Sequence, residues 1–288
     1  MSVNEVSKYL SLVKFSHTLF AMPFAFIGYF LALKYGDSYF SLKLLLLVVA
    51  CMVFARNTAM AFNRYADRHI DLHNPRTALR EIPAGILKAE SVLVFTIINA
   101  VLFIATTWFI NPMAFYLSPV ALFVITGYSL TKRFTVLCHF ILGLGLSLAP
   151  IGAYIAVTAH FHWLPILFSF IVLTWVSGFD IMYALQDERF DNDWKLKSIP
   201  AKLGSRRALI LSILLHTISA FLVVLAGTLA HMNLLYWIGA GVFITLLIYQ
   251  HLIVKPNDIS KVNLAFATTN GIASVVFAAF AIADMLFT

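Results

Sequence analysis

The chain has 288 residues, of which 61% are apolar and only 11% charged, and its mean hydropathy is +0.89. Soluble domains carry roughly 25% charged residues, so this composition excludes a soluble globular enzyme, a nucleic-acid-binding module and a disordered chain. The net charge of +7 fits the excess of Lys and Arg in the cytoplasmic loops of membrane proteins. The remaining class is a polytopic membrane protein built from helices.

Nine apolar segments are long enough to cross a bilayer, which takes about 20 predominantly apolar residues. In chain order the predicted spans are 15–34, 42–62, 91–110, 113–131, 136–158, 163–186, 208–230, 234–254 and 264–286. We therefore expect an all-α fold forming one intramembrane domain over residues 1–288. Its organisation is predicted to be two pseudo-repeated four-helix halves followed by a ninth helix. The sequence carries no indication of oligomeric state.

The basic residues determine the expected orientation. With the N-terminus in the cytoplasm, all but three of the 20 Lys and Arg residues fall in cytoplasmic segments. The exceptions are Lys34 and Lys43 in outer loops and Arg56 within the second span. This distribution follows the positive-inside rule, and nine spans place the C-terminus outside. We expect a multi-pass protein of the inner (plasma) membrane, with two long cytoplasmic loops at 63–90 and 187–207.

Acidic residues follow the second span at four-residue steps. Asn63, Asp67 and Asp71, here called the first motif, share one face if the helix continues beyond the membrane surface. Arg56 lies seven residues before Asn63, on the same face and inside the span. An ionisable residue inside a span costs a few kcal/mol on insertion scales and usually faces a cavity or a partner. The pattern therefore predicts a site at the cytoplasmic membrane surface.

The sixth span ends in a similar pattern. Asp187 and Asp191, the second motif, are four residues apart, and Asp180 lies seven residues before Asp187 with Tyr183 close to the same face. Asp180 is predicted to contact a phenol or to assist proton loss from an aromatic ring; an ion pair with Arg56 is the structural alternative. Tyr183 is predicted to orient a carboxylate or stabilise a cation, with interfacial packing as the alternative.

Both motifs place like charges four residues apart, a spacing that destabilises a helix by a few tenths of a kcal/mol. A solvated helix end would alternate its charges, whereas a divalent cation between the carboxylates removes the repulsion. Each motif is followed by a basic-x-Ile-Pro-Ala segment, at 80–84 and 197–201, and by a predicted turn glycine, Gly85 or Gly204. This repeat predicts that the two motifs face each other across one cavity.

The oxygen ligands of the two motifs suit a hard cation, and Mg²⁺ commonly binds through carboxylates, waters and substrate phosphates. Nearby basic side chains are expected to hold phosphate oxygens: Lys14, Arg68, Lys132, Arg133 and Lys202. The aromatic-rich spans, with 26 Phe and 11 Tyr, would accept a hydrocarbon tail. A polyprenyl diphosphate combines both features. Its Mg²⁺-assisted ionisation would leave an allylic cation that aromatic faces stabilise.

The two motifs and the nine spans resemble the UbiA superfamily of intramembrane prenyltransferases. The stretches 63–77, 80–85, 132–135 and 178–187 are similar to its 4-hydroxybenzoate polyprenyltransferase branch. The resemblance implies that Mg²⁺ and diphosphate are bound by the residues of both motifs: Asn63, Asp67, Asp71, Asp187 and Asp191. It also implies that four basic residues lie near the diphosphate: Arg56, Arg68, Lys132 and Arg133. Many members have Asp where this chain has Arg64, so the number of metal ions stays open.

The predicted function is Mg²⁺-dependent transfer of a polyprenyl group from its diphosphate to a hydroxylated aromatic carboxylic acid during respiratory quinone synthesis. The resemblance favours 4-hydroxybenzoate as the acceptor, and 1,4-dihydroxy-6-naphthoate of the menaquinone route is the alternative. A secondary transporter is the competing class, although transporter sites usually lie near the bilayer midplane. The sequence leaves the acceptor and the prenyl chain length open.

Overall fold

The structure is a computed structural model that describes residues 3–13 and 21–287. The bounds of its longer helices are α1 (Val3–Leu12), α2 (Met22–Tyr35), α3 (Leu42–Ala66), α5 (Ala89–Trp108), α6 (Pro112–Thr131), α7 (Cys138–Thr158), α8 (Trp163–Tyr183), α11 (Ser205–Leu229), α12 (Leu234–Ile253) and α13 (Asn270–Phe287). Shorter elements connect them: α4 (Arg68–His73), η2 (Ala184–Asp187), α9 (Glu188–Asp193), α10 (Ile199–Leu203) and the π-helical η3 (Leu264–Thr269). The predicted all-α, polytopic fold is confirmed.

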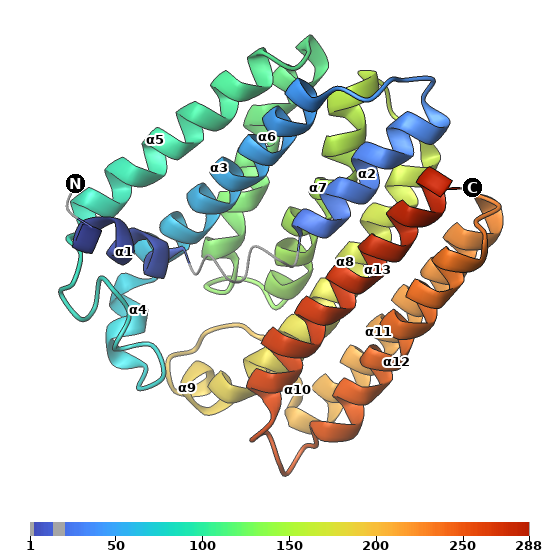
Figure 1. Ribbon diagram of the computed structural model, residues 1–288. Coiled ribbons are helices and arrows are strands. Elements are labelled where there is room, and N and C mark those ends of the chain that lie inside the picture. The colour runs from blue at the N-terminus through green and yellow to red at the C-terminus, as the bar shows by residue number, and fades with distance from the viewer. Residues whose placement is uncertain (1–2, 14–20, 288) are drawn as a thin grey trace.

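Eight of the described helices are long and apolar enough to cross a membrane. They match eight of the predicted spans closely, because an uninterrupted apolar run can satisfy its backbone only as a helix in a bilayer. The first predicted span corresponds to the 14-residue apolar helix α2. The remainder of that span, residues 15–20, lies outside the described residues. Figure 1 shows α4, α9 and α10 gathered at one end of the bundle, here called the motif end.

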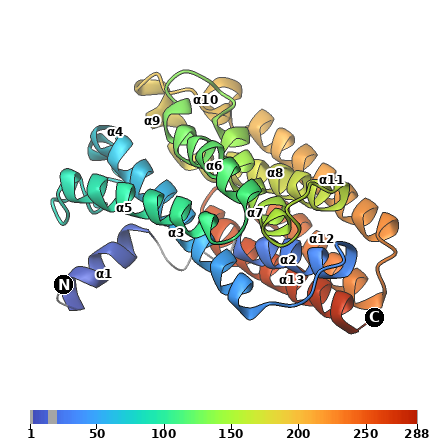
Figure 2. The same ribbon diagram turned by 90° about the horizontal axis from the view of Figure 1, so that it is seen from above.

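The two predicted halves do not form separate bundles, because a helix of the first half packs against helices of the rest of the chain. Helices α3, α5 and α6 pack against one another, whereas α2 packs mainly against α7 and α13. Figure 2 shows α2 beside α13 and α7 when the bundle is seen from above. Small residues permit this crossing: a Cβ atom on Gly28 would lie only 2.0 Å from the Pro150 carbonyl oxygen. Gly143 of α7 similarly admits the Leu173 backbone of α8.

The largest hydrophobic core surrounds α8, which packs against both α7 and α11. Trp175 of α8 is fully buried and its ring lies 5.3 Å from Phe24 of α2 and 5.7 Å from Phe243 of α12. Its indole N–H donates to the side-chain oxygen of Asn270, 3.0 Å away, so the polar atom is satisfied. This core fixes α8, whose C-terminal end carries the second motif.

Both motif helices are interrupted where the sequence pattern assumes continuity. Helix α3 ends at Ala66, Asp67 has φ −93° and ψ 5°, and a new helix begins at Arg68. Helix α8 likewise tightens into the η2 turn before α9 begins at Glu188. A four-residue period places side chains on one face only of an unbroken α-helix. These interruptions therefore turn Asp71 and Asp191 toward partners that the period alone does not indicate.

The two predicted turn glycines are confirmed by their backbone conformations. Gly85 has φ +71° and Gly204 has φ +76°, values that L side chains adopt only with strain. Gly204 separates α10 from α11 and lets the chain turn directly from one helix into the next. Each glycine thus ends the loop that follows a motif.

Candidate active site at the motif end

The first motif begins at the last turn of α3. The Asn63 side-chain amide donates to Asp67 across 3.0 Å, so the two lie together as predicted. The Arg133 guanidinium, at the end of α6, donates to the other Asp67 oxygen at 3.2 Å and to the Ala66 carbonyl at 2.6 Å. Burial raises the pKa of the Asp67 carboxyl above its ordinary value, while the hydrogen bond from Arg133 opposes the rise.

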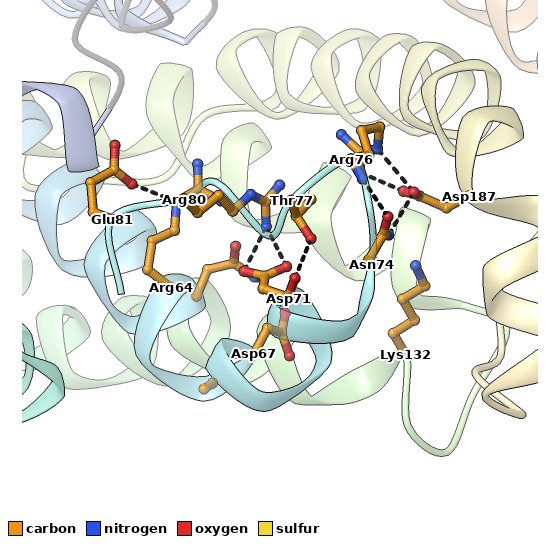
Figure 3. Close-up of polar contacts among 12 residues, drawn as sticks. Arg64, Asp67, Asp71, Asn74, Arg76, Thr77, Arg80, Glu81, Lys132 and Asp187 are labelled. Carbon is orange, nitrogen blue, oxygen red and sulfur yellow. Dashed lines mark hydrogen bonds and ion pairs between the residues drawn. The ribbon is translucent and has the colours of Figure 1, made fainter. Parts of the chain in front are cut away.

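Asp71 is buried and turns toward the loop that follows it. Arg80 donates to both carboxylate oxygens, at 2.7 and 2.8 Å, and Thr77 donates to the Asp71 backbone carbonyl (Figure 3). Arg80 is the basic residue of the first Ile-Pro-Ala segment. The loop is also held at Glu81, which pairs with Arg64 of α3 at 3.9 Å. The residue that departs from the motif pattern, Arg64, is therefore buried and paired with Glu81.

Asp187 joins the two loops. The Asn74 side-chain amide donates to its Oδ1 at 2.9 Å, and Arg76 donates from Nε to Oδ1 and from Nη2 to Oδ2 (Figure 3). We call Asn74, Arg76 and Asp187 the Asp187 bridge. Arg76 also donates to the Tyr183 hydroxyl at 3.0 Å. Burial lowers the pKa of Arg76, but the hydrogen bond and charge of Asp187 outweigh burial and raise it above the ordinary value.

Asp191 is the most buried residue of the second motif, with no solvent exposure. The Ser198 hydroxyl donates to its Oδ2 at 2.6 Å, and the Lys132 ammonium lies 2.7 Å from its Oδ1. Ser198 belongs to the second Ile-Pro-Ala segment, so each of these segments folds back onto the last aspartate of its own motif. The charge of Lys132 also acts on Asp67 and Asp187, which places Lys132 between the two motifs.

Two ionisable residues inside spans lie apart from these pairs. Asp180 of α8 is 2.7 Å from Nδ1 of His139, a different partner from the Arg56 suggested by the sequence. Arg56 lines an apolar cavity together with Tyr128. Tyr183 stacks on Phe266 of η3 with the ring centroids 4.1 Å apart, besides accepting the Arg76 hydrogen bond. Tyr183 therefore combines the polar contact and the packing contact that the sequence left as alternatives.

The cavity has a volume of about 420 Å³ and lies mainly between α3, α6 and α7. Its wall is almost entirely apolar and includes the small residues Ala59, Gly145 and Gly152. Arg56 and Tyr128 lie at its polar end, toward the motifs, and Phe161 lies at the opposite end. This volume falls in the range of small-molecule sites, which are mostly apolar with a few polar groups.

Two predicted diphosphate ligands do not turn toward the aspartates, and a third, Lys14, lies outside the described residues. The Arg68 guanidinium donates to the Tyr65 carbonyl at 2.7 Å and lies over the Tyr65 ring, 4.4 Å from its centroid. Lys202 is exposed on α10, and its backbone amide donates to the Ser198 carbonyl. The structure thus brings Lys132 and Arg133 to the motifs, and it adds Arg76 and Arg80.

The four motif aspartates each contact a basic side chain: Asp67 with Arg133, Asp71 with Arg80, Asp187 with Arg76 and Asp191 with Lys132. Within the described residues, no three acidic, His or Cys side chains form a group that could hold a metal ion. The donor set, carboxylates with an amide, nevertheless has the chemistry of a hard-cation site. The paired bases are of the kind that binds phosphate, so a cation arriving with a phosphate group would find ligands for both.

The sequence pattern did not indicate several residues that contact the motifs or Asp180 in the structure: Asn74, Arg76, Arg80, His139 and Ser198. Arg76 and Arg80 are four residues apart and close to the first motif, a signal that could have been used. His139 carries no such signal, because its partner Asp180 is 41 residues away on another helix.

Comparisons with known proteins show the family to which the chain belongs. The profile of the UbiA prenyltransferase family matches residues 21–280. The 4-hydroxybenzoate octaprenyltransferase of Aliivibrio fischeri (strain MJ11) is 29% identical over 238 residues, covering 82% of each chain. The enzyme of the same name from Tolumonas auensis is 30% identical over 239 residues, covering 83% of each chain.

Solved structures show the same fold. The apo structure of a UbiA homologue from Aeropyrum pernix K1 has a TM-score of 0.84 at 28% identity, covering 94% of this chain and 98% of that chain. A UbiA homologue from Archaeoglobus fulgidus bound to DMAPP and Mg²⁺ has a TM-score of 0.75 at 23% identity, covering 96% and 99%. Because the family profile spans nearly the whole chain, the protein belongs to the UbiA prenyltransferase family and is a membrane-embedded prenyltransferase.

Proposed function

We propose that this enzyme transfers a polyprenyl group from polyprenyl diphosphate to 4-hydroxybenzoate, with Mg²⁺ as cofactor. The observation that carries the proposal is the position of the apolar cavity, whose polar end, at Arg56 and Tyr128, lies toward two aspartate motifs lined with bases. A substrate with a charged head and a hydrocarbon tail fits that arrangement. The acceptor is inferred from the names of the two bacterial relatives, which are both 4-hydroxybenzoate octaprenyltransferases.

We propose the following roles for the residues of this chain. Asp67, Asp71, Asp187 and Asp191, with Asn63, supply the oxygen ligands for Mg²⁺, the metal named with the Archaeoglobus fulgidus structure. When bound, Mg²⁺ neutralises the negative charge that develops on the departing diphosphate. Lys132, Arg133, Arg76 and Arg80, freed from their carboxylates, bind phosphate oxygens. The apolar wall of the cavity holds the tail and excludes water from the reacting carbon.

For Tyr183 we propose a role toward the cation that forms when diphosphate leaves. Its ring stacks on Phe266, and its hydroxyl is held by Arg76, so both the plane and the hydroxyl group have fixed positions. An aromatic face stabilises a cation by about 0.5–2 kcal/mol. We assign Tyr183 this electrostatic role.

The proposed location is the inner (plasma) membrane, with the N-terminus and the motif end in the cytoplasm and the C-terminus outside. The distribution of Lys and Arg between the loops supports this orientation. A cytoplasmic motif end would give a water-soluble aromatic acid direct access from the cytoplasm.

A competition assay tests the proposal. Purified enzyme in liposomes receives Mg²⁺, a polyprenyl diphosphate and equal amounts of 4-hydroxybenzoate and 1,4-dihydroxy-6-naphthoate, and mass spectrometry identifies the products. We expect prenylated 4-hydroxybenzoate to dominate. A product made mainly from the naphthoate would assign the enzyme to the menaquinone route and contradict the proposed acceptor, while retaining the prenyl-transfer chemistry.

A further inference from the structure

Asp180 is an acidic residue inside a membrane span. It takes part in none of the ion pairs made by the motif aspartates. Its helix neighbours Phe179 and Ile181 are buried, yet the Asp180 side chain is 21% exposed. Placing an acidic residue inside a span costs free energy, and such residues face a cavity or a partner. Here the partner is His139 of α7, which is itself 3% exposed. The exposed fraction leaves part of the carboxylate open to a further contact.

The hydrogen bonds of His139 define which nitrogen carries its proton. The backbone N–H of Ile199 donates to Nε2 at 3.3 Å, and a backbone N–H can only donate. Nε2 is therefore the unprotonated nitrogen, so Nδ1 carries the proton and donates it to Oδ2 of Asp180 at 2.7 Å. His139 is therefore a hydrogen-bond donor that keeps Oδ2 of Asp180 as an acceptor.

The backbone turn at Ser198 and Ile199, which holds His139 in place, also holds the second motif. Ile199 follows Ser198, whose hydroxyl donates to Asp191 at 2.6 Å. A series of contacts thus runs from Asp191 through the Ser198–Ile199 corner to His139 and Asp180. The second Ile-Pro-Ala segment therefore sets the position of Asp180 relative to the second motif.

Asp180 is not itself part of the cavity wall, and its link to the cavity runs through Tyr128. The Tyr128 hydroxyl is within electrostatic reach of both Asp67 and Asp180, and Tyr128 lines the polar end of the cavity beside Arg56. An aromatic ring bound beside Tyr128 would therefore lie near both carboxylates. No described contact of Asp180 involves a motif aspartate, which leaves it available to the acceptor rather than to the metal.

We propose that Asp180 is the catalytic base that removes the ring proton of the acceptor, and that His139 is its positioning residue. This inference rests on the proposed aromatic prenylation. The prenyl C–O bond breaks and its electron pair leaves with diphosphate. The ring then forms a C–C bond to the prenyl carbon from its own π electrons. The C–H bond at that ring carbon breaks, its electrons restore the aromatic ring, and its proton passes to Asp180.

The test is the isotope effect of a ring-deuterated acceptor, 4-hydroxybenzoate with deuterium at both positions ortho to the hydroxyl. With the wild-type enzyme we expect no primary isotope effect, because proton removal is fast. General-base catalysis contributes about 10²–10⁴-fold, so Asp180→Asn should slow proton removal by about that factor and product formation by a smaller one. Proton loss should then limit the rate, and a primary isotope effect should appear. Diphosphate release should continue, accompanied by prenyl alcohol formed with water.

Variants of His139 separate positioning from folding. His139→Gln keeps an amide donor for Asp180 and an oxygen acceptor for Ile199, so its rate and isotope effect should stay near those of the wild type. His139→Leu removes both and should show a reduced rate with an isotope effect. His216→Gln is the matched control, because His216 is equally buried at 2% exposure but bonds the Trp175 carbonyl and His251. It should show no isotope effect.

The outcomes distinguish this inference from the function on which it rests. Asp180→Asn with wild-type turnover, or with diphosphate release abolished, would overturn the assignment of the base. His139→Leu with wild-type turnover would overturn the positioning role. A wild-type enzyme that prenylates no aromatic acid would instead refute the proposed function.

Discussion

The Asp187 bridge should contribute measurably to the stability of the metal-free enzyme. Arg76 contacts both carboxylate oxygens of Asp187, and the exposed fractions of the two side chains are 28% and 9%. Unit charges 4 Å apart attract by about 4 kcal/mol at an effective dielectric constant of 20, and desolvation offsets part of that. Breaking a fully buried pair costs about 3–5 kcal/mol. Because Asn74 keeps its bond to Asp187 and Arg76 is partly exposed, we expect Arg76→Ala to lower the unfolding free energy by about 2–3 kcal/mol.

A double-mutant cycle measures the bridge directly. Arg76→Ala, Asp187→Asn and the double variant are unfolded by denaturant titration in mixed micelles, with tryptophan fluorescence as the signal and EDTA present. We expect a coupling energy of about 1–2 kcal/mol. Arg189→Ala, which removes an exposed Arg two residues after Asp187, is the control and should be close to neutral. If the two single changes in unfolding free energy add up to that of the double variant within about 0.5 kcal/mol, the bridge is refuted.

Three further predictions concern the motifs, the turns and the cavity. Asp67→Ala and Asp191→Ala should each reduce prenyl transfer by at least about 100-fold without preventing membrane insertion; near wild-type turnover of either variant would contradict the site assignment. Gly204→Ala should destabilise the enzyme by about 1–3 kcal/mol because of its φ of +76°, whereas Gly127→Ala, in an open helical position, should not; equal melting temperatures would contradict this. Gly152→Leu, which fills the cavity away from Arg56, should favour shorter prenyl diphosphates in competition without changing the KM for the acceptor; an unchanged chain-length preference would exclude the cavity as the tail site.

The membrane-spanning architecture could be predicted from the sequence because hydropathy alone determines it. The predicted span 113–131 and helix α6, Pro112–Thr131, differ by one residue at one end, and the predicted span 42–62 differs from α3 only where the helix continues past the membrane surface. Few other structures can satisfy the backbone of such a run in lipid. The helix ends at the motifs were harder to predict from the sequence. Polar residues there allow α3 to end at Asp67 and α8 to tighten into η2.

Pairings at the motif end could be predicted only in part. The spacing of Asn63 and Asp67 correctly indicated that they lie together, since they fall within four residues of each other. Contacts such as Arg76 with Asp187 and His139 with Asp180 join segments 111 and 41 residues apart. They depend on how α7, α8 and the loops are arranged in space, which a helical period does not contain. The internal repeat was the best guide, because both Ile-Pro-Ala segments do fold onto the last aspartate of their motif.

Both motifs are proposed to act together in Mg²⁺-dependent transfer of a prenyl group to an aromatic acid. The most direct measurement follows diphosphate and prenylated 4-hydroxybenzoate simultaneously in liposomes, for the wild type, Asp67→Asn and Asp191→Asn, with Mg²⁺ or with EDTA. We expect equimolar diphosphate and product from the wild type with Mg²⁺, and neither from the variants or with EDTA. Product formation that persists in EDTA, or in either variant at the wild-type rate, would contradict it.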